Sequence, residues 1–278
     1  MNWRSEYKKC LLDTSRQYMI ETYVLNSKIW PGHEAILQRL NKKQQYTIVN
    51  KSRGVGFTTL LASYIACELV LNSDENKQYL YITPHHVMCS EFLNQVKEIV
   101  KKIPDGFFTG QNIVPRMENN STFRVGKAVI KFMTINMHTQ YMLPDNQKEQ
   151  YELIFIDEPV AGSSQFVNTY DIRSMLYTLS LACSHIIIGG TPNHKNEYWF
   201  ETIRQAINDN AYIILPWYIS YKNRENEDDT PIILHNENIE THTNKWFEKL
   251  KQNFWNKEDF EEEIECKVWR NITIKEYI

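Results

Sequence analysis

Nine consecutive residues, Lys51-Ser52-Arg53-Gly54-Val55-Gly56-Phe57-Thr58-Thr59, bring cations, glycines and hydroxyl groups together in one short segment. Glycines let a backbone approach a phosphate closely, and the free N–H groups at the start of a helix bind anions. An apolar, β-branched run precedes this segment and an apolar helical stretch follows it, which is the setting of a phosphate-binding loop. The segment therefore predicts a nucleotide-binding loop between a strand and a helix.

The loop lacks a lysine at the position where a standard phosphate-binding loop has one, because Phe57 stands there. Lys51 is the predicted substitute, since its flexible four-carbon stem can fold back over the loop. Arg53 is the predicted second cation, acting as an arginine finger within the same chain. Thr58 keeps the hydroxyl that holds Mg²⁺. The alternative is a tight glycine turn in which Lys51 and Arg53 are solvated.

A second segment, Leu153-Ile154-Phe155-Ile156-Asp157-Glu158, is an apolar strand that ends in two acids, which is the Walker B pattern. At the carboxyl edge of a parallel sheet, Asp157 is expected to join the Mg²⁺ shell. Glu158 is expected to polarise the attacking water as a general base. A strand that simply ends in solvated acids is the alternative, and the glycine loop about a hundred residues upstream favours the functional interpretation.

A third apolar strand around Ile186 to Ile188 leads into Gly189-Gly190-Thr191-Pro192-Asn193. Ligands bind at this edge in open α/β sheets, so Thr191 is a candidate sensor of the γ-phosphate. Taken alone the segment is an ordinary turn, since Gly, Pro and Asn are common turn residues. The segment becomes informative because it follows the glycine loop and the acid pair in the order of the chain.

Short apolar runs alternate with longer amphipathic segments, which is typical of a parallel sheet covered by helices. We expect an α/β fold of the P-loop NTPase class, additional-strand type. The predicted core spans residues 1–215, and a linker with a small helical lid subdomain spans 216–278, where Thr241 to Lys267 is predicted as two helices. The predicted strands are Tyr46–Asn50, Gln78–Thr83, Leu153–Asp157, His185–Gly189 and Tyr212–Leu215, with a hairpin of Thr122–Val125 and Val129–Met133. The predicted helices are Thr58–Leu71, His86–Ile103, Thr169–Cys183 and Tyr198–Ile207.

The composition is that of a folded chain with no strong electrostatic signature. Hydrophobic residues make up 42% of the 278 residues, and the formal net charge is -3. That charge gives no basic footprint of the kind nucleic-acid binders usually have, so contact with DNA is expected to be local or completed by partners. The five scattered cysteines predict neither zinc nor disulfides. No signal peptide or membrane span is predicted, which favours an intracellular location.

These three elements resemble the ATPase domain of the large terminase subunits of tailed phages. Lys51 and Phe57 match the Lys-first loop of the phage lambda type, and Ser52-Arg53 is similar to the T4 type. Asp157-Glu158 matches the Walker B pair of the family, and Gly190-Thr191-Pro192-Asn193 resembles its coupling motif. The resemblance covers roughly residues 20 to 267.

The resemblance implies a motor that binds ATP and Mg²⁺ and packages viral double-stranded DNA in the host cytoplasm. Its implied partners are the portal protein and the small terminase subunit. A homo-oligomeric ring on the portal is expected, with a monomer in isolation as the other state. His33 stands near the place where the family has an adenine-reading glutamine, and a surface histidine on an amphipathic helix is the alternative. The family's nuclease half is not expected within these residues.

Two other functions stay open from the sequence. A helicase-like translocase shares the loop and the acid pair, but it would need a second motor lobe from another chain. A nucleotide-binding scaffold without turnover is favoured by Phe57. The presence of Glu158 beside Asp157 argues against it, because a pure binder has no use for a water-activating carboxylate.

Overall fold

The computed structural model describes residues 2–42, 45–108, 116–119, 121–135, 151–159, 172–183, 185–191, 197–220, 222–223, 225–226, 228–236, 239–254, 256–257, 260–261 and 264–265. The helices are α1 (Trp3–Leu12), α2 (Gln17–Met19), α3 (His33–Lys42), α4 (Phe57–Leu71), α5 (His86–Lys102), α7 (Ile172–Ser180), α8 (Glu197–Asn208) and α9 (Lys245–Asn253), with the short turns η1 (Ile20–Val24), η2 (Asp105–Phe107) and η3 (Trp217–Ile219). The strands are β1 (Tyr46–Lys51), β2 (Gln78–Thr83), β3 (Arg116–Asn119), β4 (Thr122–Val125), β5 (Ala128–Thr134), β6 (Leu153–Asp157), β7 (Ile186–Gly190), β8 (Tyr212–Leu215), β9 (Ile232–Asn236) and β10 (Ile239–Thr243).

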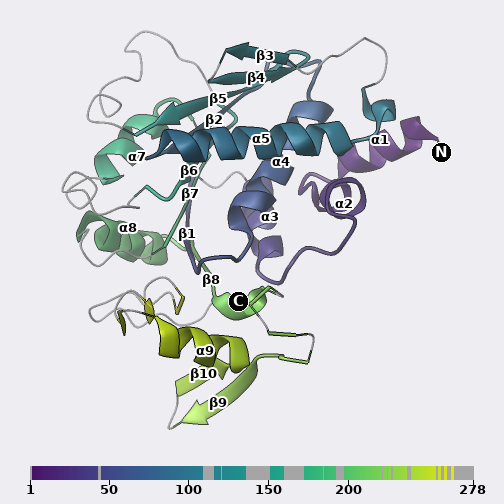
Figure 1. Cartoon of the computed structure of the whole chain (residues 1–278). Helices are drawn as coiled ribbons and strands as arrows, with labels where there is room; N and C mark the ends of the chain where they lie inside the picture. Colours follow the sequence, from purple (N-terminus) through teal and green to yellow (C-terminus); the bar gives the residue numbers. More distant parts are fainter. Residues whose placement is uncertain are drawn as a thin grey trace.

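One eight-stranded sheet forms the centre of the molecule, in the order β3-β4-β5-β2-β6-β7-β1-β8 (Figure 1). The six strands from β5 to β8 in this order pair in parallel, while β3 and β4 add an antiparallel edge. Parallel strands need crossover connections, which the flanking helices supply. The carboxyl ends of β1, β6 and β7 therefore meet at one edge of the sheet.

The strand order defines the fold class that the sequence predicted. β7 is inserted between β1, which precedes the glycine loop, and β6, which ends in the two acids. An extra strand between these two is the mark of the additional-strand P-loop NTPases. The prediction of fold class is confirmed.

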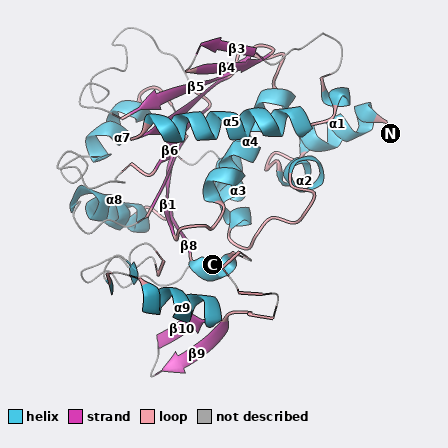
Figure 2. Cartoon of the chain, viewed as in Figure 1, coloured by secondary structure: helices cyan, strands magenta, loops and turns pink. Residues whose placement is uncertain are grey.

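The sheet has an apolar layer on each face, and helices cover both (Figure 2). Along the parallel strands successive side chains point to opposite faces, so Phe155 packs with the helices from α1 to α5, whereas Ile154 and Ile156 pack with α7 and α8. Such strands must be apolar on both sides, which explains their nearly continuous hydrophobic sequence.

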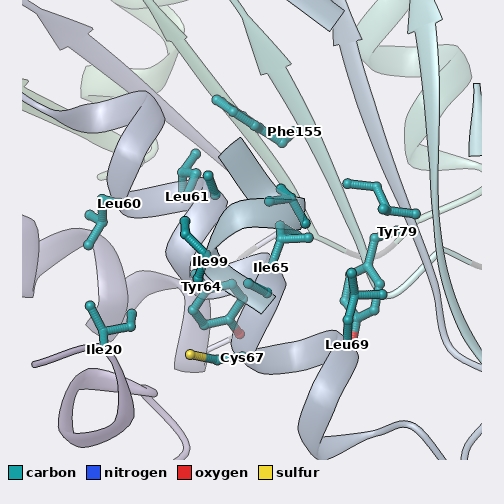
Figure 3. Packing of buried hydrophobic residues seen from close by; sticks show 14 of the residues in the cluster. Ile20, Leu60, Leu61, Tyr64, Ile65, Cys67, Leu69, Tyr79, Ile99 and Phe155 are labelled. Carbon is teal, nitrogen blue, oxygen red and sulfur yellow. The ribbon is translucent and has the colours of Figure 1, made fainter. Parts of the chain in front are cut away.

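Helix α4 is the centre of the larger layer, and it is buried around most of its circumference. A helix that is apolar all round belongs in a core, and α4 begins directly at the glycine loop. Figure 3 shows Leu61 and Ile65 of α4 among Ile99 of α5, Phe155 of β6 and Tyr79 of β2. The loop is therefore anchored at its C-terminal end by the most deeply buried helix of the protein.

The predicted core elements are confirmed with shifts of one or two residues at most ends. β1 extends to Lys51, β7 runs from Ile186 to Gly190, and α4 starts at Phe57. Helix α7 is shorter than predicted within the part described, and residues 169–171 lie outside it.

The C-terminal part differs from the prediction of two helices. Thr241 and Thr243 lie in β10, which pairs with β9 as an antiparallel hairpin, so the helix predicted from Thr241 is wrong at its start. β-Branched threonines on either side of His242 favour a strand. The helix starts at Lys245, and the preceding Asn244 side chain accepts a hydrogen bond from the Phe247 backbone N–H and caps α9. The division into core and lid at residue 215 stays a prediction, although Trp217, Phe247, Phe260 and Ile264 form a separate apolar cluster.

The contact of Phe57 with Gly189 yields a stability prediction. A Cβ atom added at Gly189 would lie 1.9 Å from Cε1 of Phe57, so the Phe57 ring or the β7 backbone would have to shift. We expect Gly189→Ala to lower the free energy of unfolding by roughly 1–3 kcal/mol, as overpacked cores do. Urea unfolding followed by circular dichroism measures it.

The matched control is the double variant Gly189→Ala with Phe57→Leu. Because the smaller side chain vacates the space that the new methyl group needs, the double variant should lose less than the sum of the two single losses. Strict additivity, or a Gly189→Ala variant as stable as the original protein, would show that the ring does not fill this space.

Candidate functional site

The glycine loop follows β1 and turns into α4 through two residues in left-handed backbone conformation. Gly54 has φ +74° and Gly56 has φ +71°, values that glycine adopts without the cost a Cβ would add. Gly56 is also the N-cap of α4, so the loop ends where the free N–H groups of the helix begin. The backbone therefore has the two left-handed glycines and the helix N-terminus from which a phosphate-binding loop was predicted, and phosphate binding itself stays a prediction.

Lys51, the last residue of β1, reaches across the sheet edge to the acid pair. Its ammonium group forms an ion pair with Oε1 of Glu158, and it lies 6.0 Å from the centre of the Phe57 ring. Both charged side chains are largely buried, at 10% and 15% exposure. Lys51 thus places its charge beside the two acids at the end of β6. Its predicted reach over the loop to phosphate oxygens stays a prediction.

Glu158 is fixed at both carboxylate oxygens. Oε1 binds Lys51, and Oε2 accepts hydrogen bonds from the backbone N–H (3.0 Å) and the hydroxyl (3.2 Å) of Thr191. Burial works against ionisation here, but Lys51 and Thr191 outweigh it and hold the pKa of Glu158 below its ordinary value. The carboxylate is charged at neutral pH and is aligned between the loop and the end of β7.

The backbone at Glu158 is also unusual. Its φ is +49°, a left-handed value that non-glycine residues adopt at a cost of about 1 kcal/mol or more. The conformation is held by the hydrogen bond from the Glu158 N–H to the carbonyl of Gly189 (2.7 Å) and by the contacts of the side chain. Residues held in this way concentrate at functional sites.

Asp157 lies one residue earlier and is 1% exposed. Its Oδ2 accepts hydrogen bonds from Thr58 Oγ1 (3.0 Å) and from the Tyr81 hydroxyl (3.3 Å). Burial, together with the nearby Glu158 charge, raises the pKa of Asp157 to about 6, although Lys51 opposes the shift. The second oxygen, Oδ1, is buried without a hydrogen-bond partner. A buried carboxylate oxygen without a hydrogen-bond partner fits a cation that arrives with a ligand.

A Mg²⁺ ion suits the residues at this point. Mg²⁺ keeps several waters and takes one or two protein oxygens plus substrate phosphates, so it needs no cage of carboxylates. Thr58 and Asp157 supply one hydroxyl and one carboxylate side by side. Among the residues that the structure describes, no group of three or more His, Cys, Asp or Glu side chains could hold a metal by itself.

Phe57 lies in the core of the protein, at 2% exposure. Its ring packs edge-on against Phe155 of β6, with centroids 5.5 Å apart, and against Gly189 of β7. An apolar ring in this position leaves no room there for a charged side chain. The positive charge that a standard loop lysine would supply therefore has to come from another residue. Lys51 lies close by, beside Glu158.

The remaining residues of the loop contact their surroundings as follows. Ser52 is buried, and its N–H donates to the Leu215 carbonyl at the end of β8 (2.9 Å). Arg53 is exposed at the outer side of the loop. The Thr59 hydroxyl accepts a hydrogen bond from Gln95 of α5 (2.8 Å). Gly190 ends β7 and Thr191 donates hydrogen bonds to Glu158, whereas Pro192 and Asn193 lie outside the described residues. The sensing and coupling roles of this segment stay predictions.

His33 is buried at the start of α3, at 5% exposure, so the alternative of a surface histidine is wrong. The ring stacks on Trp30, and Nε2 lies 2.8 Å from the Val55 carbonyl of the loop. Burial lowers the pKa of His33, which keeps the ring neutral at pH 7. Trp30 and His33 line a cavity of about 220 Å³ together with Gly56, Thr59 and Lys222. This cavity opens beside the helix end of the loop.

A connector after β8 contacts the loop from the other side. Ser220 Oγ donates to the Gly54 carbonyl (3.2 Å), and Asn223 is buried next to Gly54. Asn244, the cap of α9, donates to the Asn223 carbonyl (2.9 Å). The Asp229 carboxylate accepts hydrogen bonds from the first two N–H groups of α9 and from the Glu225 N–H. Burial raises the pKa of Asp229, but these three hydrogen bonds outweigh burial and keep the pKa below its ordinary value. A chain of hydrogen bonds thus joins the loop to α9.

Sequence reasoning missed several residues that the fold brings to this site: Tyr81, Gln95, Ser220 and Asn223. Tyr81 was detectable, because its position on the strand that neighbours the acid strand places it beside Asp157. The contacts of Gln95 and Ser220 come from segments far away in sequence and have no local signal.

The fold is that of the P-loop NTPases, a mostly parallel sheet flanked by helices, and Lys51 stands at the first position of its glycine loop. No family model matches the chain, and no curated protein matches its sequence. Comparison with solved structures places the chain among the ATPase folds of phage large terminases. No helix in the described ranges has the length and apolar character that crossing a membrane requires.

The large terminase ATPase domain of Thermus phage P74-26 is similar to this chain with a TM-score of 0.55 and 13% identity, over 88% of this chain and 95% of that domain. A mutant of that domain is similar to this chain with a TM-score of 0.56 and 13% identity. The large terminase of bacteriophage HK97 is similar with a TM-score of 0.51 and 14% identity, over 69% of this chain. The match spans 40% of the HK97 protein. At these identities the likeness establishes the shared fold.

The buried pair of Lys51 and Glu158 yields a prediction for the ligand-free protein. Lys51→Met should lower the free energy of unfolding at pH 7 by about 3–5 kcal/mol, because it leaves a buried carboxylate without its cation. In the original protein the pKa of Glu158 lies below its ordinary value. The ion pair therefore stabilises the folded protein fully when the pH is above the ordinary glutamate pKa of about 4.3, and this stabilisation is lost as the pH falls through the lowered pKa. The difference between the two proteins should therefore shrink in acid.

Lys51→Met combined with Glu158→Gln is the control, since an amide needs no counter-ion. It should recover most of the lost stability in denaturant titrations at pH 7. Equal stability of Lys51→Met and the original protein at all pH values would mean that Lys51 does not face Glu158 in solution.

Proposed function

We propose that this chain hydrolyses ATP with Mg²⁺ and uses the energy to drive double-stranded viral DNA into a capsid. The observation that supports hydrolysis most directly is the meeting of Lys51, Thr58, Asp157 and Glu158 at the carboxyl edge of one sheet. Each supplies a different function that phosphoryl transfer to water requires. The shared fold with terminase ATPase domains supports the link to DNA packaging.

The roles of the residues follow from their positions. Thr58 and Asp157 hold the Mg²⁺, which neutralises phosphate charge when bound. The N–H groups at the start of α4 and the backbone around Gly54 and Gly56 bind the phosphates. Glu158, charged and oriented, polarises the attacking water as general base.

Lys51 has two competing partners in this scheme. Without nucleotide its ammonium group pairs with Glu158. Phosphate oxygens at the loop attract the same ammonium group, and a shift of Lys51 toward them releases one carboxylate oxygen for water. Glu158 then keeps its orientation through Thr191, whose contact also links the acid to the coupling segment at the end of β7. Arg53 provides further positive charge from the exposed side of the loop.

The partners proposed for this activity are a portal protein, a small terminase subunit and further copies of the chain in a ring. With a net charge of -3, one copy has little attraction for DNA, while several copies lining a channel sum weak contacts. The setting is the cytoplasm of an infected host cell. A helicase-like translocase and an inactive scaffold are the outcomes that the next experiment separates.

Mg²⁺-dependent ATP hydrolysis, with and without duplex DNA, tests the proposal. We expect the original protein to turn over ATP and DNA to stimulate it, whereas Lys51→Ala and Glu158→Gln should each lower kcat by roughly 100-fold or more. Glu158→Gln should still bind ATP, because the water-activating group does not hold the phosphates. Lys101→Ala, an exposed lysine on α5, is the control and should be unchanged.

The outcomes are distinct. An original protein that binds ATP but hydrolyses none with DNA and portal present would establish a scaffold in place of a motor. Hydrolysis stimulated by single-stranded nucleic acid and not by duplex would favour the helicase-like function. Full activity in Lys51→Ala would remove the Lys-first loop from the mechanism.

Base recognition is proposed for the cavity beside His33. The Val55 carbonyl can only accept, so the neutral ring donates from Nε2, which leaves Nδ1 as an acceptor. An acceptor suits the 6-amino group of adenine and not the 6-oxo group of guanine. We expect ATP to bind about 10-fold more tightly than GTP, the equivalent of one hydrogen bond.

Competition titrations with the His33 variants measure this preference. His33→Leu should bind both nucleotides alike, whereas His33→Gln should keep the preference because an amide can donate to Val55 and accept from adenine. An unchanged ATP preference in His33→Leu would exclude His33 as the base-reading residue.

A further inference from the structure

Strand β2 places two buried tyrosines on the same face of the sheet, and each donates a hydrogen bond to a buried acid. Tyr79 and Tyr81 are each 1% exposed, and their side chains point into the layer that contains α4 and α5. The Tyr79 hydroxyl donates to Oε2 of Glu68 on α4 (2.8 Å). The Tyr81 hydroxyl donates to Oδ2 of Asp157 (3.3 Å). The two contacts share one chemistry, but the acids differ in their other partners.

Glu68 has a complete set of partners. Its Oε1 pairs with Nε of Arg16 (2.5 Å), and its Oε2 accepts a hydrogen bond from Asn72 (3.2 Å) in addition to the one from Tyr79. A buried carboxylate needs such a cation and such donors, because an unpaired buried charge is costly. The contact between Tyr79 and Glu68 therefore belongs to a structural network that needs no ligand.

Asp157 has donors at one carboxylate oxygen and none at the other. Its Oδ2 accepts hydrogen bonds from Thr58 (3.0 Å) and from Tyr81, which together occupy both lone pairs of that oxygen. Its Oδ1 is buried without a hydrogen-bond partner, and the ammonium group of Lys51 pairs with the adjacent Glu158. Of the two acids that a β2 tyrosine contacts, only Asp157 is therefore left with an unsatisfied oxygen.

The Tyr81 ring is held by aromatic neighbours from three elements. It stacks on Phe92 of α5, with centroids 4.0 Å apart and planes at 8°, and it contacts Phe155 of β6 (5.2 Å) and Phe132 of β5 (6.0 Å). Side chains in a closely packed core stay in one rotamer on average. The packing of the ring therefore keeps the hydroxyl beside Asp157.

The orientation of the Asp157 carboxylate depends on these donors. A carboxylate can turn about its Cβ–Cγ bond, because the last torsion of aspartate is broad and nearly two-fold. One donor leaves this rotation open, whereas two donors on the same oxygen, Thr58 from α4 and Tyr81 from β2, fix the plane of the carboxylate. Oδ1 is then the oxygen that is left for a cation.

We propose that Tyr81 is a positioning residue of the cation site, whose hydroxyl holds Oδ2 of Asp157 so that the carboxylate offers Oδ1 alone to Mg²⁺. This single-oxygen arrangement suits Mg²⁺, because Mg²⁺ keeps several waters and demands near-octahedral geometry. Ca²⁺ takes more oxygens and accepts a carboxylate through both of them. Tyr81 therefore favours Mg²⁺ over Ca²⁺. This role rests on the proposed binding of Mg²⁺ with nucleotide at the glycine loop.

Binding of a fluorescent ADP analogue, measured by anisotropy at increasing Mg²⁺ concentration, tests the proposal without hydrolysis. Tyr81→Phe removes the hydroxyl and keeps the ring that stacks on Phe92. We expect the variant to need about 10-fold more Mg²⁺ for half of the Mg²⁺-dependent binding, the equivalent of one hydrogen bond to a charged group. Without Mg²⁺ it should bind the analogue as the original protein does. In Ca²⁺ titrations it should lose less, because a freed carboxylate can use both oxygens.

Tyr79→Phe is the matched control, because it removes a buried tyrosine hydroxyl on the same strand from an acid that has its own cation. It should lower the urea concentration of half-unfolding and leave both cation titrations unchanged. A purely structural hydroxyl at Tyr81 would act in the same way, so the two variants separate a structural role from a positioning role.

Three results would overturn the role of Tyr81: an unchanged Mg²⁺ requirement in Tyr81→Phe, an equal shift in Tyr79→Phe, or equal losses for Mg²⁺ and Ca²⁺. In each of these cases the Mg²⁺-dependent binding of the original protein would leave the proposed nucleotide site standing. An original protein that binds the analogue without any dependence on Mg²⁺, or does not bind it, would overturn the proposed site and the role of Tyr81 together.

Discussion

Two neighbouring acids at the end of a buried strand impose the main constraint on this structure. Asp157 and Glu158 are adjacent and largely hidden from water, so at least one positive charge must lie beside them. Lys51 meets this need at Glu158, while Oδ1 of Asp157 is buried without a hydrogen-bond partner, and burial raises the pKa of Asp157. The site is thus short of positive charge, which favours the arrival of a cation together with its anionic ligand.

This constraint also explains the unusual loop. Phe57 is committed to the core between Phe155 and Gly189, where a charge would be costly. Lys51 stands at the end of β1 and pairs with Glu158 from there. The first residue of α4 can therefore be the apolar Phe57. Compared with a standard loop, the positive charge lies on the strand and not on the helix. Phe57, at the start of α4, packs instead against Phe155 and Gly189 of the sheet.

The sequence predicted the parts that depend on local pattern. Apolar runs located the buried strands, and glycine spacing located the loop, because both signals lie within a few consecutive residues. The hairpin of β9 and β10 was missed because Thr241 and Thr243 stand next to a strongly helical segment. The sequence pointed to His33 by its position but did not predict that it is buried. Its contacts with Trp30 and Val55 form only when the chain folds. The roles assigned to the site residues stay predictions, and Ser220 had no signal at all.

The link between Ser220 and the Gly54 carbonyl has a mechanical consequence. One hydrogen bond is worth about 1 kcal/mol, which is only about twice the thermal energy, so it opens and closes readily. The covalent chain through Leu215 transmits tension from the core to α9 at all times, whereas this side link transmits it only while the loop keeps its shape. The side link between the connector and the loop is therefore reversible, and it holds only while the loop keeps the Gly54 carbonyl beside Ser220.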